Sequence, residues 1–196
     1  MKTQRVLIIT KFIFVLALLV IFSSLAYAAE TYKLDPAHTS IVFRVKHLGV
    51  SYVFGRFNGP TGSFVFDESS PSKNAIEMQA ETKNIDTAVE KRDTHLKSPD
   101  FFNAGEYPLV SFKSKSVKKS GETAYEVSGD LTLLGKTRPI TVEVHATGAG
   151  KDPWGGFRRG FETSFSIKRS DFGMGFMMGG VSDEVNLTVS VEGIRQ

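Results

Sequence analysis

The sequence contains no cysteine, which excludes disulfide bonds, iron–sulfur clusters, thiolate catalysis and cysteine-ligated zinc. It also lacks a G-x-S-x-G nucleophile elbow, and the Gly-Ala-Gly-Lys run at residues 148–151 is followed by Asp152 instead of the Ser or Thr of a P-loop. The four histidines show no H-x-x-x-H spacing, so a metal site would need ligands from distant segments. We therefore expect no metal, no cofactor and no ready-made catalytic motif.

Residues 1–28 predict a secretory signal peptide. Three basic residues precede the apolar run Phe12–Phe22, and Ala26-Tyr27-Ala28 is a small-x-small cleavage signal. The apolar run is shorter than the roughly 20 residues needed to span a bilayer. This length favours cleavage over a membrane anchor, so we expect no stable membrane insertion after the signal peptide is removed.

The charge balance changes once residues 1–28 are set apart. They carry three of the 24 Lys and Arg residues and no acidic residue, so the rest of the chain has 21 basic and 21 acidic side chains. A formally neutral domain gives no indication of a nucleic acid partner. The length that remains suits a single domain with one core, over residues 29–196.

Period-two alternation of apolar and polar residues dominates from Thr31 onward, with Gly, Pro and Asn turns between the segments. Ile41, Phe43, Val45 and His47, for example, share one face of a predicted strand. About eight such segments occur, with spacings typical of antiparallel neighbours. The expected fold class is all-β, as a sandwich or a closed barrel. Closure removes exposed edges, and about eight strands enclose room for one elongated ligand.

Phenylalanine is abundant, with 16 residues in 196. Because Phe has no polar tip that needs a partner, it suits the wall of an apolar pocket, and it fills a solid core equally well. Composition alone leaves both alternatives open. A one-residue error in register would move any predicted set of inward residues to the outside. The residues that we expect to form a channel wall are Phe43, Val45, Phe64, Phe66, Met78, Phe112, Val142, Phe165 and Leu187.

One stretch, Thr87–Phe112, interrupts the strands with helical signals. Thr87 and Glu90 match the T-x-x-E capping box, and Ser98-Pro99 is typical of a second helix start, so two short helices are expected. The stretch places cationic side chains close to aromatic ones. We interpret it as a lid that closes an apolar cavity and presents positive charge to a ligand.

Two glycine-rich stretches each have two interpretations. Asp171–Gly180 interleaves Met and Phe with Gly, which favours a mobile apolar loop at a pocket mouth or a loop packed on the core. Asp152–Gly156 is a tight turn that contains Trp154. This tryptophan either contacts a ligand headgroup at the rim or plugs one end of the barrel, and we favour the plug.

A series of short motifs runs in order through the chain after residue 31. They are Tyr32-x-Leu34-Asp35 with His38 and Phe43; His47-Leu48-Gly49-x-Ser51 with Gly55 and Phe57; Arg92-Asp93-x-His95-Leu96-x-Ser98-x-Asp100-Phe101-Phe102 before Tyr107-Pro108; Gly129-Asp130-Leu131-Thr132-Leu133-x-Gly135 with Pro139; Asp152-Pro153-Trp154-Gly155 with Arg158 and Gly160-Phe161; and Val191-Glu192-Gly193. Together they resemble the YceI-like family of exported, lipocalin-like polyisoprenoid-binding proteins.

The resemblance implies an extended antiparallel β-barrel with a short helical insert, and a long apolar channel that holds an isoprenoid chain or a quinone-like lipid. It also implies a periplasmic location and no catalytic centre. Residues 29–196 are then expected to be one YceI-like lipid-binding β-barrel domain, a non-enzymatic carrier of a polyisoprenoid or an isoprenoid quinone. Cations and ring N–H groups suit a phosphate or quinone oxygen at the channel mouth. The candidates there are His47, Arg92, His95, Lys97 and Arg158.

Two other functions stay open at this point. An enzyme acting on its lipid could use His95 or His47 as acid and base with Asp93 or Asp100, although Asp93 and His95 point in different directions if they lie on one helix. A structural or interaction protein would use its Phe-rich face to contact a membrane protein and would hold no ligand. The sequence also leaves open a homodimer.

Overall fold

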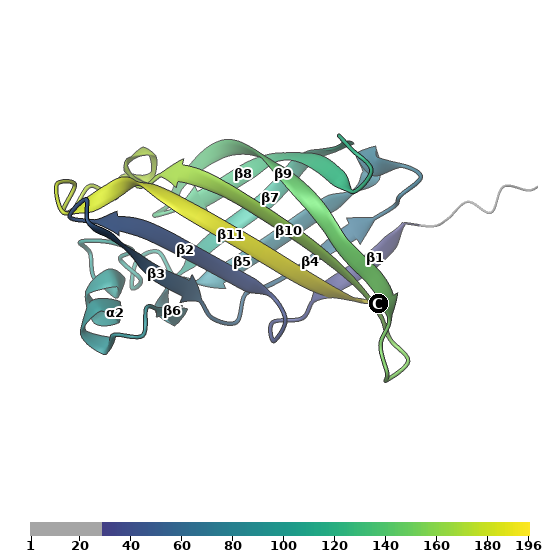
Figure 1. The fold of residues 1–196 in the computed structure, drawn as a ribbon, viewed down its shortest axis with the longest axis horizontal. Coiled ribbons are helices and arrows are strands. Elements are labelled where there is room, and N and C mark those ends of the chain that lie inside the picture. The colour runs from purple at the N-terminus through teal and green to yellow at the C-terminus, as the bar shows by residue number, and fades with distance from the viewer. Residues whose placement is uncertain (1–28) are drawn as a thin grey trace, which may run out of the picture.

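The computed structural model describes residues 29–196, so the predicted signal peptide lies outside the described residues. Strands dominate residues 29–196, which also contain one α-helix and three single-turn 3₁₀ helices (Figure 1). Within the described part of the chain, no helix is long and apolar enough to cross a membrane. The elements in order are β1 (Glu30–Leu34), β2 (Ser40–His47), β3 (Ser51–Phe57), β4 (Thr61–Phe66), η1 (Pro71–Lys73), β5 (Ala75–Glu81), η2 (Thr82–Asn84), β6 (Ile85–Asp86), α2 (Glu90–Lys97), β7 (Leu109–Lys119), β8 (Ala124–Leu133), β9 (Lys136–Lys151), β10 (Phe157–Lys168), η3 (Arg169–Phe172) and β11 (Val181–Arg195).

Eight strands form a closed antiparallel ring in the order β1-β4-β5-β7-β8-β9-β10-β11. The seam between β11 and β1 closes it through three residue pairs, Tyr32 with Arg195, Lys33 with Ile194 and Leu34 with Gly193. Short turns join β7 to β8, β8 to β9 and β9 to β10, as antiparallel pairing allows. The expected all-β, roughly eight-stranded antiparallel barrel with a short helical insert is confirmed.

β2, β3 and β6 extend the ring at one end. β11 is 15 residues long, and its two halves use the same edge for different partners. Residues 193–195 pair with β1, whereas residues 181–190 pair with β2. β3 then pairs with β2, and β6 pairs with β3 (Figure 1). The barrel is therefore lengthened toward α2 by strands that lie beyond the eight-stranded ring.

The inward faces follow the predicted alternation. Buried aromatic rings meet inside the ring, where Phe161 packs edge-on against Phe64 at 5.4 Å and tilted against Phe66 at 5.4 Å between ring centroids. Tyr32, which is fully buried, stacks on Phe64 at 4.7 Å. A smaller cluster lies toward α2, where it includes Phe43, Phe57, Ala80 and Ile85. Aromatic pairs of this kind add to the stabilisation from burial alone.

The helical insert differs from the two-helix prediction. α2 begins at Glu90, and Ala88 just before it has a left-handed φ of 61°, so Thr87 lies too early to cap the helix. The prediction of a Thr87–Glu90 capping box is therefore wrong. Instead, the Asp93 carboxylate accepts hydrogen bonds from the Thr87 amide at 2.9 Å and from the Thr87 hydroxyl. The second helix is also wrong. Turns follow Ser98, whose carbonyl accepts from the amides of Phe101 and Asn103.

Gly193 marks a tight approach at the barrel seam. A Cβ at this position would lie 2.4 Å from an edge carbon of the buried Phe64 ring and 2.9 Å from Cβ of Tyr32. Gly193→Ala is therefore expected to lower the free energy of unfolding by about 1–3 kcal/mol, as overpacking of a full core does. Urea unfolding measures this change. Gly148→Ala is the matched control, because a Cβ on Gly148 has no atom within 4 Å, and an equal loss in both variants would contradict the prediction.

Candidate functional site: an apolar cavity inside the barrel

A cavity of about 170 Å³ lies inside the barrel. Its wall consists of 27 residues from β2, β3 and all ring strands except β1, together with Asn74 just before β5. Apart from the Tyr125 hydroxyl, polar side chains in this wall come only from Asn74, Ser111, Glu162 and Thr163. The wall includes no Lys, Arg or His. A lining of this kind favours an uncharged, apolar ligand, since burial of an unpaired charge is costly.

Seven of the nine residues predicted for a channel wall line this cavity. Phe43 and Val45 do not, because β2 contributes only Ile41 near its start to the wall, and the rest of β2 continues along the first half of β11, beyond the ring. Phe43 packs instead with Phe57 and Ile85, and Val45 pairs with Val53 and Val185. The seven that line it are Phe64, Phe66, Met78, Phe112, Val142, Phe165 and Leu187.

The cavity wall also contains residues that sequence reasoning left out. Phe161 and Tyr125 are buried and join the aromatic cluster, and Phe57 lines the end toward α2. The sequence does contain a pattern that predicts two of them. Phe161 lies on the same period-two strand face as Phe165, and Tyr125 on the same face as Val127. Taking every second residue of β8 and β10 would have found them.

Four of the residues predicted for the mouth gather at the α2 end, and none of them lines the cavity. Arg92 and Lys97 lie on α2 with His95, and His47 ends β2. The Arg92 side chain is hydrogen-bonded to Thr87, which lies before the helix. It donates to the Thr87 hydroxyl and to the Thr87 carbonyl oxygen, both at 2.7 Å. These side chains therefore border the end of the barrel and not its interior.

Of the pairs that the enzymatic alternative names in the insert, the structure brings His95 together with Asp100 and not with Asp93. Asp93 accepts from Thr87, whereas His95 Nε2 lies 2.8 Å from the Asp100 carboxylate. Both His95 and Asp100 are about half exposed. The His95 ring also packs edge-on against Phe101 and Phe176. An exposed pair of this kind that does not border the cavity gives no support to acid and base chemistry on a bound lipid.

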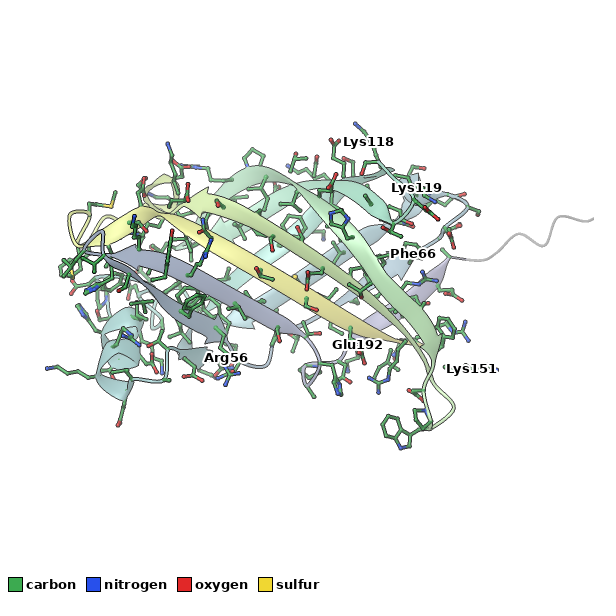
Figure 2. The ribbon with its side chains drawn as sticks, viewed as in Figure 1. Arg56, Phe66, Lys118, Lys119, Lys151 and Glu192 are labelled. Carbon is green, nitrogen blue, oxygen red and sulfur yellow. The ribbon has the colours of Figure 1, made fainter. Side chains whose placement is uncertain are left out.

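Arg158 is not brought together with the other mouth residues. It pairs with Ile194 near the end of β11, whereas His47 pairs with Val181 at its start. Thirteen residues of strand separate these points, which is on the order of 40 Å. Figure 2 shows Glu192, a partner of Arg158, near the C-terminal end of β11 and far from α2. The position of Arg158 in the sequence could not reveal at which end of the barrel it lies, because β10 runs the full length of the barrel.

At that far end Arg158 holds three carboxylates. It donates to Asp35 at 2.7 Å, to Asp152 at 3.0 Å and to Glu192. Asp35, His38 and Glu192 together have the spacing of a possible metal-binding group, but the Arg158 guanidinium already supplies the cation between the two carboxylates. Trp154 is 81% exposed, so the interpretation that it plugs the barrel is wrong.

The Arg158 cluster predicts a loss of stability in acid. Hydrogen bonds from Arg158 and then from His38 lower the pKa of Asp35 from its ordinary value of 3.8 to about 2. A lowered folded-state pKa contributes stability above about pH 4 that is lost as the pH falls toward 2. Arg158→Gln removes the main cause, so the wild type should lose more of its free energy of unfolding between about pH 5 and pH 2 than the variant. Urea unfolding at both pH values tests this, and equal losses would contradict it.

Arg169 was not singled out from the sequence, yet it organises the Met- and Gly-rich loop. Its side chain is 2% exposed and donates to the backbone carbonyl oxygens of Met174, Phe176, Val181 and Ser182, at 2.7–3.0 Å. Burial lowers the pKa of this guanidinium. The first half of the loop is packed on the core, with Phe172 and Met174 buried, and the second half exposes Phe176, Met177 and Met178. The interpretation of a loop packed on the core is therefore confirmed for the first half, and a mobile apolar loop at a pocket mouth stays a prediction for the second half.

A closed antiparallel barrel around an apolar cavity defines a lipocalin-like class of structure. The YceI-like domain model matches residues 32–193, and the chain belongs to the YceI-like family. It is 47% identical over 170 residues to a UPF0312 protein of Pseudomonas paraeruginosa, covering 86% of this chain and 88% of that protein.

Two solved structures share the fold. BcnA of Burkholderia cenocepacia has a TM-score of 0.75 at 24% identity, with 81% of this chain and 98% of that chain covered. A structure described as a polyisoprenoid binding domain from Saccharophagus degradans, implicated in plant cell wall breakdown, has a TM-score of 0.66 at 13% identity, with 84% and 98% covered. At these identities the likeness establishes the architecture of the barrel.

Proposed function

We propose that this protein is a non-enzymatic periplasmic binding protein that carries a polyisoprenoid or an isoprenoid quinone in its barrel cavity. The observation that supports the proposal most directly is the wall itself, which is almost wholly apolar and contains no cationic side chain. A branched hydrocarbon chain matches such a wall, and each Å² of apolar surface removed from water stabilises the complex by about 25 cal/mol. The polyisoprenoid binding domain with the same architecture supports the choice of lipid.

The absence of paired catalytic groups along the described wall supports a carrier over an enzyme. Glu162 is the one acidic residue among the 27 lining residues, and it is exposed. A general acid or base must lie within hydrogen-bond reach of the reacting atom. We propose the periplasm as the location because residues 1–28 have the sequence pattern of a signal peptide.

The α2 end is the proposed entrance. The inner side of this end is filled by Phe101, Leu133, Phe172 and Met174, and Phe102 packs edge-on against the lining residue Phe57 at 5.5 Å. Movement of the insert would uncover the cavity at Phe57. His47, Arg92, His95 and Lys97 would then border the path that the lipid takes, and they would meet its polar group in passing.

Native mass spectrometry of protein exported with its own signal sequence, followed by denaturing mass spectrometry of the same sample, tests the proposal. A carrier is expected to show an excess mass that disappears on denaturation and fits a series of isoprene units. A bare polypeptide mass that stays unchanged after polyisoprenoids and quinones are added would contradict the proposal. It would instead support an interaction protein without a ligand.

A further inference from the structure

Asn74 carries an unused hydrogen-bond donor in the cavity wall. The residue is 8% exposed, lies between η1 and β5, and lines the cavity. Its side-chain nitrogen Nδ2 is the single buried side-chain nitrogen or oxygen atom without a hydrogen-bond partner among residues 29–196. Buried polar groups are nearly always paired, and an unpaired one is costly, so such an exception calls for a physical explanation.

The orientation of this amide is determined by its neighbours. Oδ1 of Asn74 accepts a hydrogen bond from the Asp67 backbone amide at 2.6 Å, so Oδ1 must be the oxygen and Nδ2 the free donor. The Asn74 backbone amide donates to the Pro71 carbonyl oxygen at 3.0 Å, which fixes the main chain as well. The donor is therefore held in place before any ligand arrives, which reduces the entropy that binding would lose.

Asn74 lies at the end of the cavity away from α2. Val65 pairs with Ala75, so Asn74 is next to the end of β4 and to Phe66, which Figure 2 shows at the end of the barrel opposite α2. β5 runs seven residues from Ala75 toward the insert, or roughly 23 Å. Tyr125, whose ring packs edge-on against Phe66 at 5.7 Å, lines the same region.

The surroundings favour an uncharged acceptor. The cavity wall has no cation, and the Asp67 carboxylate beside Asn74 is buried. Hydrogen bonds from Ser69 lower the pKa of Asp67, which keeps it negative. Lys73, which precedes Asn74, is exposed, and the Arg159 guanidinium lies over the Phe66 ring, 4.2 Å from its centroid, and donates to the Tyr32 hydroxyl at 3.4 Å. A phosphate at Asn74 would be buried beside the Asp67 carboxylate, in a wall with no cationic side chain of its own.

From these contacts we infer that the Asn74 side-chain amide binds a neutral oxygen of the lipid, such as a quinone carbonyl, at the β4–β5 end of the cavity. The inference rests on the proposed carrier function and makes it more specific. It orients the lipid with its uncharged polar end at Asn74 and its hydrocarbon chain toward α2. It also makes Asn74 a specificity-determining residue, which separates neutral isoprenoids from isoprenyl phosphates.

The test compares three probes, which are menaquinone-4, the hydrocarbon squalene and geranylgeranyl phosphate. Asn74→Asp keeps the oxygen that accepts from Asp67 and removes the donor. It is expected to weaken menaquinone-4 binding about tenfold, as the loss of one buried hydrogen bond does, and to leave squalene binding unchanged. Gln79→Glu, the same amide-to-carboxyl change on the exposed outer face of β5, is the control and is expected to change neither.

A measurement on the unaltered protein keeps the inference testable if Asn74→Asp does not fold. In the wild type, the side-chain amide protons of Asn74 should shift in NMR spectra on addition of menaquinone-4 and stay in place with squalene. Equal effects of Asn74→Asp on both probes, an unmoved amide signal, or tighter binding of geranylgeranyl phosphate than of menaquinone-4 would each overturn the inference while the carrier function stands. Failure of the wild type to bind any of the three would instead contradict the proposed function.

Discussion

Val142→Trp is expected to reduce lipid affinity about 100-fold while the barrel still folds. Val142 is 9% exposed and lines the cavity from β9. A tryptophan side chain pointing inward would occupy space that the lipid needs. If it separates roughly 110 Å² of lipid surface from the wall, the loss at ~25 cal/mol per Å² is about 2.7 kcal/mol, or about a factor of 100 in Kd. Titration with menaquinone-4 measures the change.

The neighbouring residue supplies the control for this variant. Glu143 is exposed on the outer face of the same strand, so Glu143→Trp adds the same ring outside the barrel. We expect its affinity to match that of the wild type. Equal affinity of the Val142→Trp variant and the wild type would show that the lipid does not occupy this cavity, provided that circular dichroism shows both variants folded.

Arg169→Met is expected to lower the free energy of unfolding by at least about 3 kcal/mol. The substitution leaves carbonyl oxygens of residues 174, 176, 181 and 182 without their donor, and hydrogen bonds to a charged group are worth about 1.5–3 kcal/mol each. For a chain of this size the melting temperature should fall by about 6–12 °C. Thermal unfolding followed by circular dichroism measures the shift.

Loss of the Arg169 contacts should also release the loop that they hold. Limited proteolysis is expected to cleave Arg169→Met between residues 173 and 180 faster than it cleaves the wild type. Lys168→Met is the matched control, because Lys168 is exposed at the end of β10 and has the same change in charge. If both variants melt and are cleaved alike, the buried guanidinium does not organise the loop.

The barrel could be predicted from sequence because its signal is local. Alternation at period two places Phe64 with Phe66, and Leu187 with Val189, on one face, whatever the rest of the chain does. The antiparallel order follows from turn spacing, whereas the predicted number of about eight strands matches the ring alone, because β2, β3 and β6 add three more. The extension by β2 could not be predicted this way, because the choice of β1 or β2 as the partner of β11 depends on how the twisted sheet closes. Phe43 and Val45 were therefore placed in the wall when they lie beyond it.

The polar contacts could not be predicted from the sequence, because no short motif encodes which residues come close together in the fold. Arg158 donates a hydrogen bond to Asp35, which lies 123 residues away in the sequence. It therefore lies at the end of the barrel opposite the predicted mouth. Thr87 matched a capping box, but the left-handed backbone at Ala88 moves the helix start to Glu90. The Thr87 hydroxyl therefore donates a hydrogen bond to the Asp93 carboxylate. Asn74 shows no motif at all. Its unused donor became visible only when the neighbouring Asp67 amide and the cavity were both in place.

The seam between β1 and β11 has a consequence for the folding reaction. The two strands that close the ring lie about 160 residues apart in sequence and share only three residue pairs. Contacts of such long range form late, since the entropy of bringing the segments together is lost before the contact stabilises them. Until then the apolar wall stays open to water along unpaired strand edges. We therefore expect slow folding through aggregation-prone intermediates. A ligand that binds the open apolar wall should shorten the time for which these intermediates expose apolar surface.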